Sequence, residues 1–220
     1  MKIATWNVER LKHKRELPKI TEICNEMAAD ILVLTETDSS LDLNYRSCFR
    51  TLSPIDAAVP YRSSENRVAI YTGCEFVEEY KTFDGQTAIC VELSTNHGNL
   101  LVYGVVIGVF GNRHQNFFTD LSRIVSDIER LAATGKHLCV CGDFNCSFSD
   151  NYYYTKEGRT KLEKAFKENN LKLLTRKQPE CIDHIAISRK FIGASAAGIE
   201  EWNRDKKLSD HKGIFVELTR

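Results

Sequence analysis

Short apolar segments with the length and pattern of β-strands recur along the whole chain, and this recurrence limits the fold more than any other feature. Apolar residues at helical spacing separate some of these segments and predict helices over 16–28, 117–133 and 157–169. The first strand, helix and buried strand form a βαβ unit. Two packed β-sheets with helices outside would bury this much apolar surface. The predicted strands are 2–7, 30–35, 67–72, 75–80, 87–94, 99–107, 137–141, 171–174, 182–188, 195–201 and 213–218.

The length and composition favour one globular domain over residues 1–220. A chain of 220 residues has the size of one large domain, and no repeat or linker divides it. With 42% hydrophobic and 27% charged residues, the composition excludes a disordered chain, a collagen-like chain and a coiled coil. The formal net charge of +0 argues against attachment to nucleic acid or membranes by bulk charge, although a local basic face stays open.

No segment has the properties of a membrane span or a signal peptide. The longest uncharged run, 93–112, has an apolar centre of only residues 100–110, which is too short to cross a bilayer. The first residues, MKIATWNVER, contain no apolar stretch followed by a cleavage site. We therefore expect a cytoplasmic protein. The sequence indicates no protein partner, and we expect a monomer.

The eight cysteines are scattered and never form a C-x-x-C motif. In a chain of this length without a signal peptide, they are expected to be free thiols in a reducing compartment. A zinc site built from Cys139, Cys141, Cys146 and His184 is the alternative. The spacing of these residues matches neither a zinc finger nor a zinc ribbon, so small buried thiols are favoured.

Polar residues gather at the ends of strands whose interiors are apolar. A buried carboxylate needs a partner, and for any single motif an Arg or a helix N-terminus would suffice. Together, however, the motifs supply five carboxylates, two carboxamides and a histidine. Oxygen ligands of this kind suit a hard divalent ion, and a metal beside a base and hydrogen-bond donors is what hydrolysis of a phosphate ester requires. The motifs are TWNVE (5–9), LTE (34–36), GDFN (142–145), IDH (182–184) and SDH (209–211).

These motifs, with the first extended to TWNVERL (5–11), resemble those of the endonuclease/exonuclease/phosphatase superfamily, in the family's order and over nearly the whole chain. The resemblance implies a DNase I-like four-layer α/β sandwich, in which two mixed β-sheets pack face to face with helices outside. It also implies an exonuclease III-like, metal-dependent phosphohydrolase. Mg²⁺ is the expected cofactor, with Mn²⁺ as the alternative.

The resemblance also implies which residues hold the metal. Glu36 would be the main ligand. Asn7 would assist at the metal or the phosphate, Glu9 would be an auxiliary ligand, and Asp210 would lie beside the metal.

A second group of residues would carry the reaction. The resemblance implies that Asp143 orients or deprotonates the attacking water, while Asn145 holds that water or a phosphoryl oxygen. Asp183 would orient His211, which would bind the phosphate or shuttle a proton. An Asp beside an imidazole also fixes its tautomer and favours its charged form. His184 adjoins Asp183 on a strand, so its side chain points to the opposite face, and we interpret it as structural.

The sequence departs from the family pattern at two places. Thr35 stands where the family often has Gln before the metal-binding Glu. Tyr103, in LVYGVVIG, represents the middle motif as a catalytic phosphate ligand, and a tyrosine in the core is the alternative. Arg113 and His114 follow that strand and offer another contact to the phosphate, unless their loop simply leaves them in solvent.

Local charge favours nucleic acid among the phosphate esters that the superfamily hydrolyses. Residues 1–20 and 156–177 are rich in Lys and Arg, and the second segment follows three tyrosines, 152–154, that could stack on bases. We predict phosphate contacts from Arg159 and Lys161, although a solvated helix face is the simpler interpretation. The predicted function is therefore a small endo- or exonuclease.

Two other functions stay open. One is a phosphatase or phosphodiesterase for a small metabolite or lipid headgroup, which would have a narrow pocket. The other is a binding module that has lost catalysis, but none of the core motif residues is missing.

Overall fold

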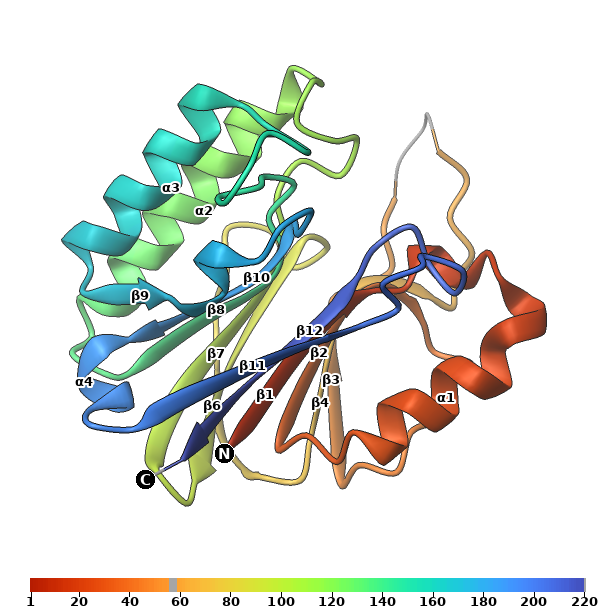
Figure 1. Cartoon of the computed structure of the whole chain (residues 1–220), viewed down its shortest axis with the longest axis horizontal. Coiled ribbons are helices and arrows are strands. Elements are labelled where there is room, and N and C mark those ends of the chain that lie inside the picture. The colour runs from red at the N-terminus through yellow and green to blue at the C-terminus, as the bar shows by residue number, and fades with distance from the viewer. Residues whose placement is uncertain (56–58, 220) are drawn as a thin grey trace.

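The computed structural model describes residues 1–55 and 59–219, which form two six-stranded mixed sheets packed face to face (Figure 1). The first sheet has the order β11-β12-β1-β2-β4-β3 and the second β5-β6-β7-β8-β10-β9. The strands of the first sheet are β11 (Ala196–Trp202), β12 (Gly213–Thr219), β1 (Lys2–Asn7), β2 (Ile31–Asp38), β4 (Glu65–Thr72) and β3 (Ser47–Arg50). Those of the second are β5 (Glu75–Tyr80), β6 (Ala88–Thr95), β7 (Gly98–Val106), β8 (Leu138–Asp143), β10 (Asp183–Ser188) and β9 (Leu171–Leu173).

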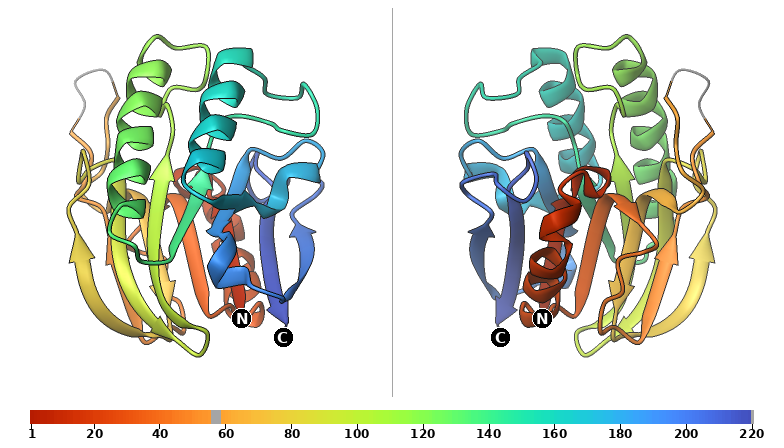
Figure 2. Two further views of the ribbon diagram at one scale, coloured as in Figure 1. Left: turned by 90° about the vertical axis from the view of Figure 1, so that its left-hand side faces the viewer. Right: turned by 90° about the vertical axis from the view of Figure 1, so that its right-hand side faces the viewer.

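Helices cover the outer face of each sheet and complete the four layers. Helix α1 (Leu17–Glu26) packs on the first sheet, whereas α2 (Asn116–Ala132) and α3 (Lys156–Glu168) lie side by side on the second (Figures 1 and 2). The fourth helix, α4 (Arg189–Ile192), is a single turn after β10. Within residues 1–55 and 59–219, no helix combines the length and the apolar character needed to cross a membrane. The α/β sandwich predicted from the sequence is confirmed.

Alternation of side chains along the strands divides the core into three layers. Ile3 of β1 packs between the sheets, whereas Ala4 and Trp6 face the layer under α1. Leu121 and Ile128 of α2 pack on the outer face of the second sheet. These placements follow from the two-residue period of strands and the 3.6-residue period of helices.

Strand directions bring all five polar motifs to one end of the sandwich. β1 and β2 are parallel neighbours joined through α1, as the predicted βαβ unit requires. β12 is antiparallel to β1, and β10 is antiparallel to β8. The starts of β12 and β10 therefore lie beside the ends of β1 and β8. Asp183 and His211 come just before or at the start of a strand, whereas Asn7 ends one.

The structure corrects the ends of two predicted strands. β2 continues to Asp38, and Glu36 lies inside it between Thr35 and Thr37, which pair with Val68 and Asn66 of β4 in an unbroken register. β8 does not stop at Gly142 but continues to Asp143. Glu36 has a φ of 46°, so its backbone conformation is the left-handed one that side chains other than glycine seldom adopt.

The cysteines do not form the alternative zinc site. All eight are free thiols, and none belongs to a metal-ligand cluster among the described residues. Cys139 and Cys141 pack between the two sheets, whereas Cys146 packs under α2 and α3. The thiols of Cys139 and Cys141 therefore face away from the thiol of Cys146.

Gly142 allows β8 to approach β7 closely just before Asp143. Its φ is 138°, and a Cβ atom placed on it would lie 2.1 Å from the carbonyl oxygen of Val105. We expect Gly142→Ala to lower the free energy of unfolding by about 2 to 4 kcal/mol, because both the backbone and the neighbouring strand must shift. Gly98→Ala is the matched control in urea denaturation, since its φ of 109° is also positive but nothing lies within 4 Å of its added Cβ. Equal losses in both variants would contradict a steric role for Gly142.

Candidate active site

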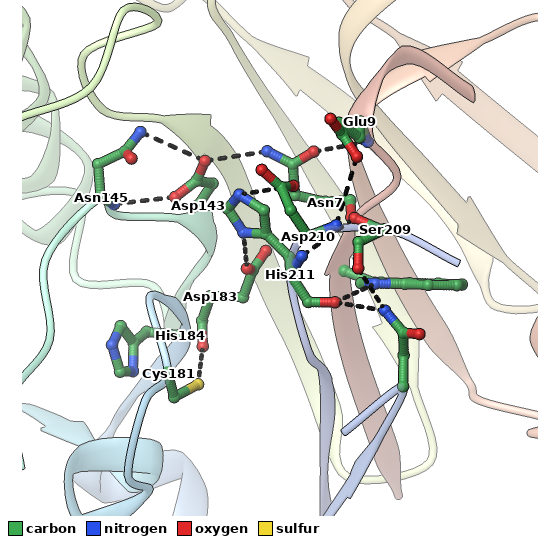
Figure 3. A network of polar contacts seen from close by, with 12 residues as sticks. Asn7, Glu9, Asp143, Asn145, Cys181, Asp183, His184, Ser209, Asp210 and His211 are labelled. Atoms are coloured by element: carbon green, nitrogen blue, oxygen red, sulfur yellow. Dashed lines mark hydrogen bonds and ion pairs between the residues drawn. The ribbon is translucent and has the colours of Figure 1, made fainter. Parts of the chain in front are cut away.

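The polar motifs meet where the two sheets face each other, and Figure 3 shows Asn7, Asp143, Asp183 and His211 gathered there. Asn7 comes from the first sheet, Asp143 and Asp183 from the second, and His211 from the loop before β12. The Asn7 Nδ2 atom donates a hydrogen bond of 3.0 Å to Asp143 Oδ2. This bond joins the first and second sheets directly within the site.

Asp143 is held by amide donors. The backbone N–H of Asn145 donates to Asp143 Oδ1 at 2.9 Å, and Asn145 Nδ2 lies 3.3 Å from Asp143 Oδ2. The same amide group also donates to the carbonyl of Ile107 at 3.1 Å, which fixes its orientation. Burial, with a smaller contribution from the nearby Asp183, raises the pKa of Asp143 to about 7. The carboxylate is thus fixed in position and poised to accept a proton near neutral pH.

Asp183 and His211 form a buried pair. His211 Nδ1 lies 2.6 Å from Asp183 Oδ2, and because a carboxylate only accepts, the imidazole donates this bond. Burial opposes the charge on the ring, but Asp183 and Asp143 outweigh it and raise the pKa of His211 to about 10. The ring is therefore cationic at neutral pH, with Nε2–H left to face a ligand.

Three groups that the sequence analysis did not identify hold the His211 loop. Ser209 Oγ donates to the Asn7 carbonyl at 2.6 Å and accepts from the His211 N–H at 3.2 Å. The His211 carbonyl accepts bonds from Trp6 Nε1 at 3.1 Å and Asn203 Nδ2 at 2.7 Å. Ser209 could have been predicted, because it lies beside Asp210 in the SDH motif. No sequence motif marks Asn203.

Glu36 lines the cavity beside these residues. Its φ of 46° sets it apart from its neighbours in β2, although the register against β4 is the same before and after it. Burial raises the pKa of Glu36, while His211 and Asn7 counteract it. No cation forms an ion pair with Glu36 among the described residues, so its carboxylate has no fixed positive partner.

The other two predicted metal ligands are more exposed or already engaged. Glu9 pairs with Lys12 at 2.8 Å and His13 at 3.3 Å, and one of its oxygens also accepts the Asp210 N–H at 3.3 Å. The Asp210 side chain is 66% exposed, with an oxygen 3.7 Å from His211 Nε2. Asp210 therefore lies at the open side of the site.

The donor set fits a hard divalent cation. Three carboxylates, Glu36, Asp143 and Asp210, line one cavity, and oxygen donors of this kind suit such an ion. A cluster of ligand atoms from Asp143, Asp183 and His211 lies within 4.8 Å. In that cluster His211 is already bonded to Asp183, so Glu36 and the other carboxylates of the cavity are the residues that could hold a cation.

Two cavities of about 260 Å³ each meet at the polar motifs. Both are lined by Glu36, Asp210 and His211, with Phe110 as a shared aromatic wall. One continues past Asp143 and Asn145 to Tyr152 and Tyr153, and the other past Asn7 and Glu9 to Arg10, Lys12 and Tyr61. A groove therefore extends to both sides of the site.

A model of the endonuclease/exonuclease/phosphatase family matches residues 4–211. The chain belongs to this family. Its members are phosphoric ester hydrolases, so this class follows for the chain. No curated protein sequence matches this chain.

Solved structures with the same fold include nucleic-acid enzymes. A 3′ phosphatase from Neisseria, bound to a product DNA hairpin, aligns with a TM-score of 0.71 and 18% identity over 100% of both chains. An AP endonuclease from Archaeoglobus fulgidus aligns with a TM-score of 0.73 and 14% identity, again over 100% of both. Humanized D. rerio TDP2 has a TM-score of 0.68 and 12% identity, covering 100% of this chain and 99% of its own. At these identities, the likeness establishes a DNase I-like sandwich.

In this family member, Tyr103 is not the phosphate ligand that the sequence predicts. Its side chain is fully buried in the core under α2, and its hydroxyl donates to Asp127 Oδ2 at 3.0 Å. Successive side chains of β7 alternate between the helix-covered face and the inter-sheet face, and Tyr103 faces the helices. The tyrosine therefore links β7 to α2.

The structure also separates the predicted substrate contacts from the site. Arg159 donates to the carbonyl groups of Ser147 and Asp150 and lies over the Tyr154 ring, so it braces the loop before α3. Lys161 pairs with Glu157 at 2.9 Å in the groove between α2 and α3. Both side chains are engaged on the helix side because α3 presents them there rather than to the cleft.

Arg113 and His114 lie in the exposed loop between β7 and α2. The His114 ring lies 5.1 Å from the ring of Phe110, which lines both cavities. Neither loop residue lines either of these two cavities, and His114 borders the groove through its contact with Phe110.

His184 is a buried structural histidine. Its Nε2 lies 3.0 Å from the Cys146 carbonyl and its Nδ1 lies 2.8 Å from Thr175 Oγ1. Since a carbonyl only accepts, Nε2 carries the proton and Nδ1 accepts from Thr175. Burial lowers the pKa of His184 from 6.5 to about 4.

This buried ring predicts a loss of stability in acid. Between pH 6.5 and pH 4 the unfolded chain binds a proton at His184 that the folded chain does not bind. The contribution of His184 to the free energy of unfolding should therefore be greatest above pH 6.5 and fall by about 3 kcal/mol as the pH approaches 4. In urea titrations, His184→Gln should be less stable at pH 8 but lose less over this window. Parallel pH profiles for the two proteins would contradict the prediction.

Proposed function

We propose that this chain is a Mg²⁺-dependent nuclease that hydrolyses phosphodiester bonds in nucleic acid. The observation that carries the proposal is the groove, which continues on both sides of Glu36 and His211. A phosphodiester has a substituent on each side of its phosphorus, whereas a small phosphomonoester needs room on one side only. An open groove therefore suits a chain-like substrate better than a blind pocket would.

The side chains divide the work of hydrolysis. Asp143, held by Asn7 and Asn145, would orient the attacking water and accept its proton. His211, kept charged and oriented by Asp183, would donate from Nε2 to a phosphoryl oxygen. A divalent cation held by Glu36, with Asn7 and Asp210 beside it, would supply positive charge to offset the charge that develops on the phosphate.

The walls of the groove support a nucleic-acid substrate. Phe110 is 40% exposed where the two cavities meet, and an aromatic ring there offers a stacking surface for a base or sugar. Tyr152 and Tyr61 stand in opposite arms of the groove, each with a cation over its ring. The Neisseria enzyme described above is bound to a DNA hairpin, which favours the same class of ligand.

An assay of substrate class tests this function. The purified protein with Mg²⁺ should hydrolyse single- or double-stranded DNA or RNA, or abasic DNA, faster than a panel of small phosphomonoesters, and Asp143→Ala should abolish that activity. Mn²⁺ in place of Mg²⁺ checks the choice of metal. Preferential hydrolysis of small phosphomonoesters would instead favour a metabolite or headgroup phosphatase, for which the modest volume of each cavity is the supporting observation.

A further inference from the structure

A second groove, separate from the reaction site, lies beneath α3 at the edge of the second sheet. It has a volume of about 540 Å³ and is bounded by α3, β9, the turn Leu174–Lys177 and the start of α4. β9 is the edge strand of its sheet and lies below α3 in Figure 1. The cations around the groove are Lys167, Lys172, Arg176, Lys177 and Arg189.

Positive charge in this groove is largely uncompensated. Glu163 is the single carboxylate among the lining residues, and it pairs with Arg176 at 2.6 Å. For the other four cations, no carboxylate within residues 1–55 and 59–219 lies at ion-pair distance. Since the whole chain has a net charge of +0, this groove concentrates positive charge that the rest of the chain offsets elsewhere. Gathered cations without partners attract a polyanion.

We propose that this basic groove binds the phosphate backbone of the nucleic acid whose phosphodiester is hydrolysed in the cleft. The inference rests on the proposed nuclease function. The cations come from four elements, α3, β9, the turn Leu174–Lys177 and α4, so they border the groove from several sides, as contacts to a run of phosphates require.

The chain itself limits the distance between this groove and the cleft. Lys177 lines the groove and Ile182 lines the reaction cavity, and five residue steps separate them. A fully extended chain spans at most about 3.6 Å per residue, so their Cα atoms are no more than about 18 Å apart. At about 3.4 Å per nucleotide, this corresponds to roughly five nucleotides. A strand of about 20 nucleotides can therefore reach both grooves, whereas a 4-mer carries too few phosphates to fill the cleft and also contact the five cations of the groove.

The test compares two lengths of single-stranded oligonucleotide with the full chain in Mg²⁺. In the wild type, KM for a random 20-mer should be at least about 10-fold lower than KM for a 4-mer at 50 mM salt. The double variant Lys172→Glu, Lys177→Glu should raise KM for the 20-mer about 10-fold or more, with kcat and the 4-mer values unchanged. The log–log salt dependence of 20-mer binding should become shallower by about 1.4, because two single-strand contacts are lost.

The matched control is Lys19→Glu, Lys81→Glu, which changes the net charge equally at two exposed lysines outside both grooves. It should leave the length dependence intact. Lys172→Gln, Lys177→Gln provides a second groove variant, with thermal unfolding to show that each variant is folded. Unchanged length dependence in the groove variants, or an equal effect in the control, would overturn the inference.

Binding of a fluorescent 20-mer separates this inference from the proposed function. If the 20-mer binds through the groove but no oligonucleotide is hydrolysed, the nuclease function is rejected and the binding role of the groove is retained. Hydrolysis that is unchanged by the groove substitutions would reject only the proposed binding role of the groove. Polyglutamate that binds the groove while the oligonucleotide does not would also overturn it, in favour of an acidic protein partner.

Discussion

Replacing Glu36 by Gln should lower kcat/KM by more than about 100-fold at low Mg²⁺, since even residues that only support metal ligands account for 10- to 100-fold effects. The substitution keeps the size of the side chain but removes a carboxylate that lines both cavities and forms no ion pair among the described residues. Kinetics over a range of Mg²⁺ concentrations, together with calorimetric binding of Mg²⁺ or Mn²⁺, provide the measurement. Both the activity and the metal affinity should fall.

Glu9→Gln is the matched control for this prediction. Glu9 is already paired with Lys12 and His13, so its loss should cost less than about 10-fold. If kcat/KM of Glu36→Gln stays near the wild-type value at low Mg²⁺ while that of Glu9→Gln falls, Glu9 rather than Glu36 is the main metal ligand.

Asp183 and His211 should behave as one unit. The 2.6 Å bond fixes the imidazole and sustains its charge, so Asp183→Asn and His211→Ala should each lower kcat by about 100-fold or more. Because each substitution disables the same group, the double variant should be only slightly worse than the poorer single one.

Single-turnover rates of the wild type, both single variants and the double variant provide the measurement of this coupling. Losses that multiply in the double variant would show that the two residues act separately. Cys181→Ala is a useful control, because its thiol bonds to the Asp183 carbonyl and not to the carboxylate.

Strand positions were predictable where side chains alternate in a buried sheet. β1 and β5 have the predicted bounds, and the βαβ unit follows directly from the apolar pattern. β3 was missed because its four residues, Ser47–Arg50, are half-buried at a sheet edge and carry no such pattern. The residues of the polar motifs could be named from the sequence because each motif adjoins an apolar strand. Strand direction then gathers these motifs at one end of the sandwich.

The remaining parts of the site depend on features that sequence spacing does not encode. The left-handed backbone of Glu36 has no signature in the apolar pattern, and the bond between Asn7 and Asp143 forms only when the two sheets pack. Tyr103 was wrongly predicted because the motif pattern does not say which face of β7 its side chain occupies. Arg159 follows the Asp143 motif in sequence, but its guanidinium bonds to the loop before α3 rather than facing the cleft.

The position of β1 between β2 and β12 divides its backbone pairing between distant parts of the sequence. One edge pairs with β2, which follows soon after it, whereas the other is completed only by residues 213–219. A chain cut before β12 would therefore expose an apolar strand edge with unpaired backbone groups to other chains. Such a chain should aggregate, and a cut before residue 209 would also remove the loop that carries His211.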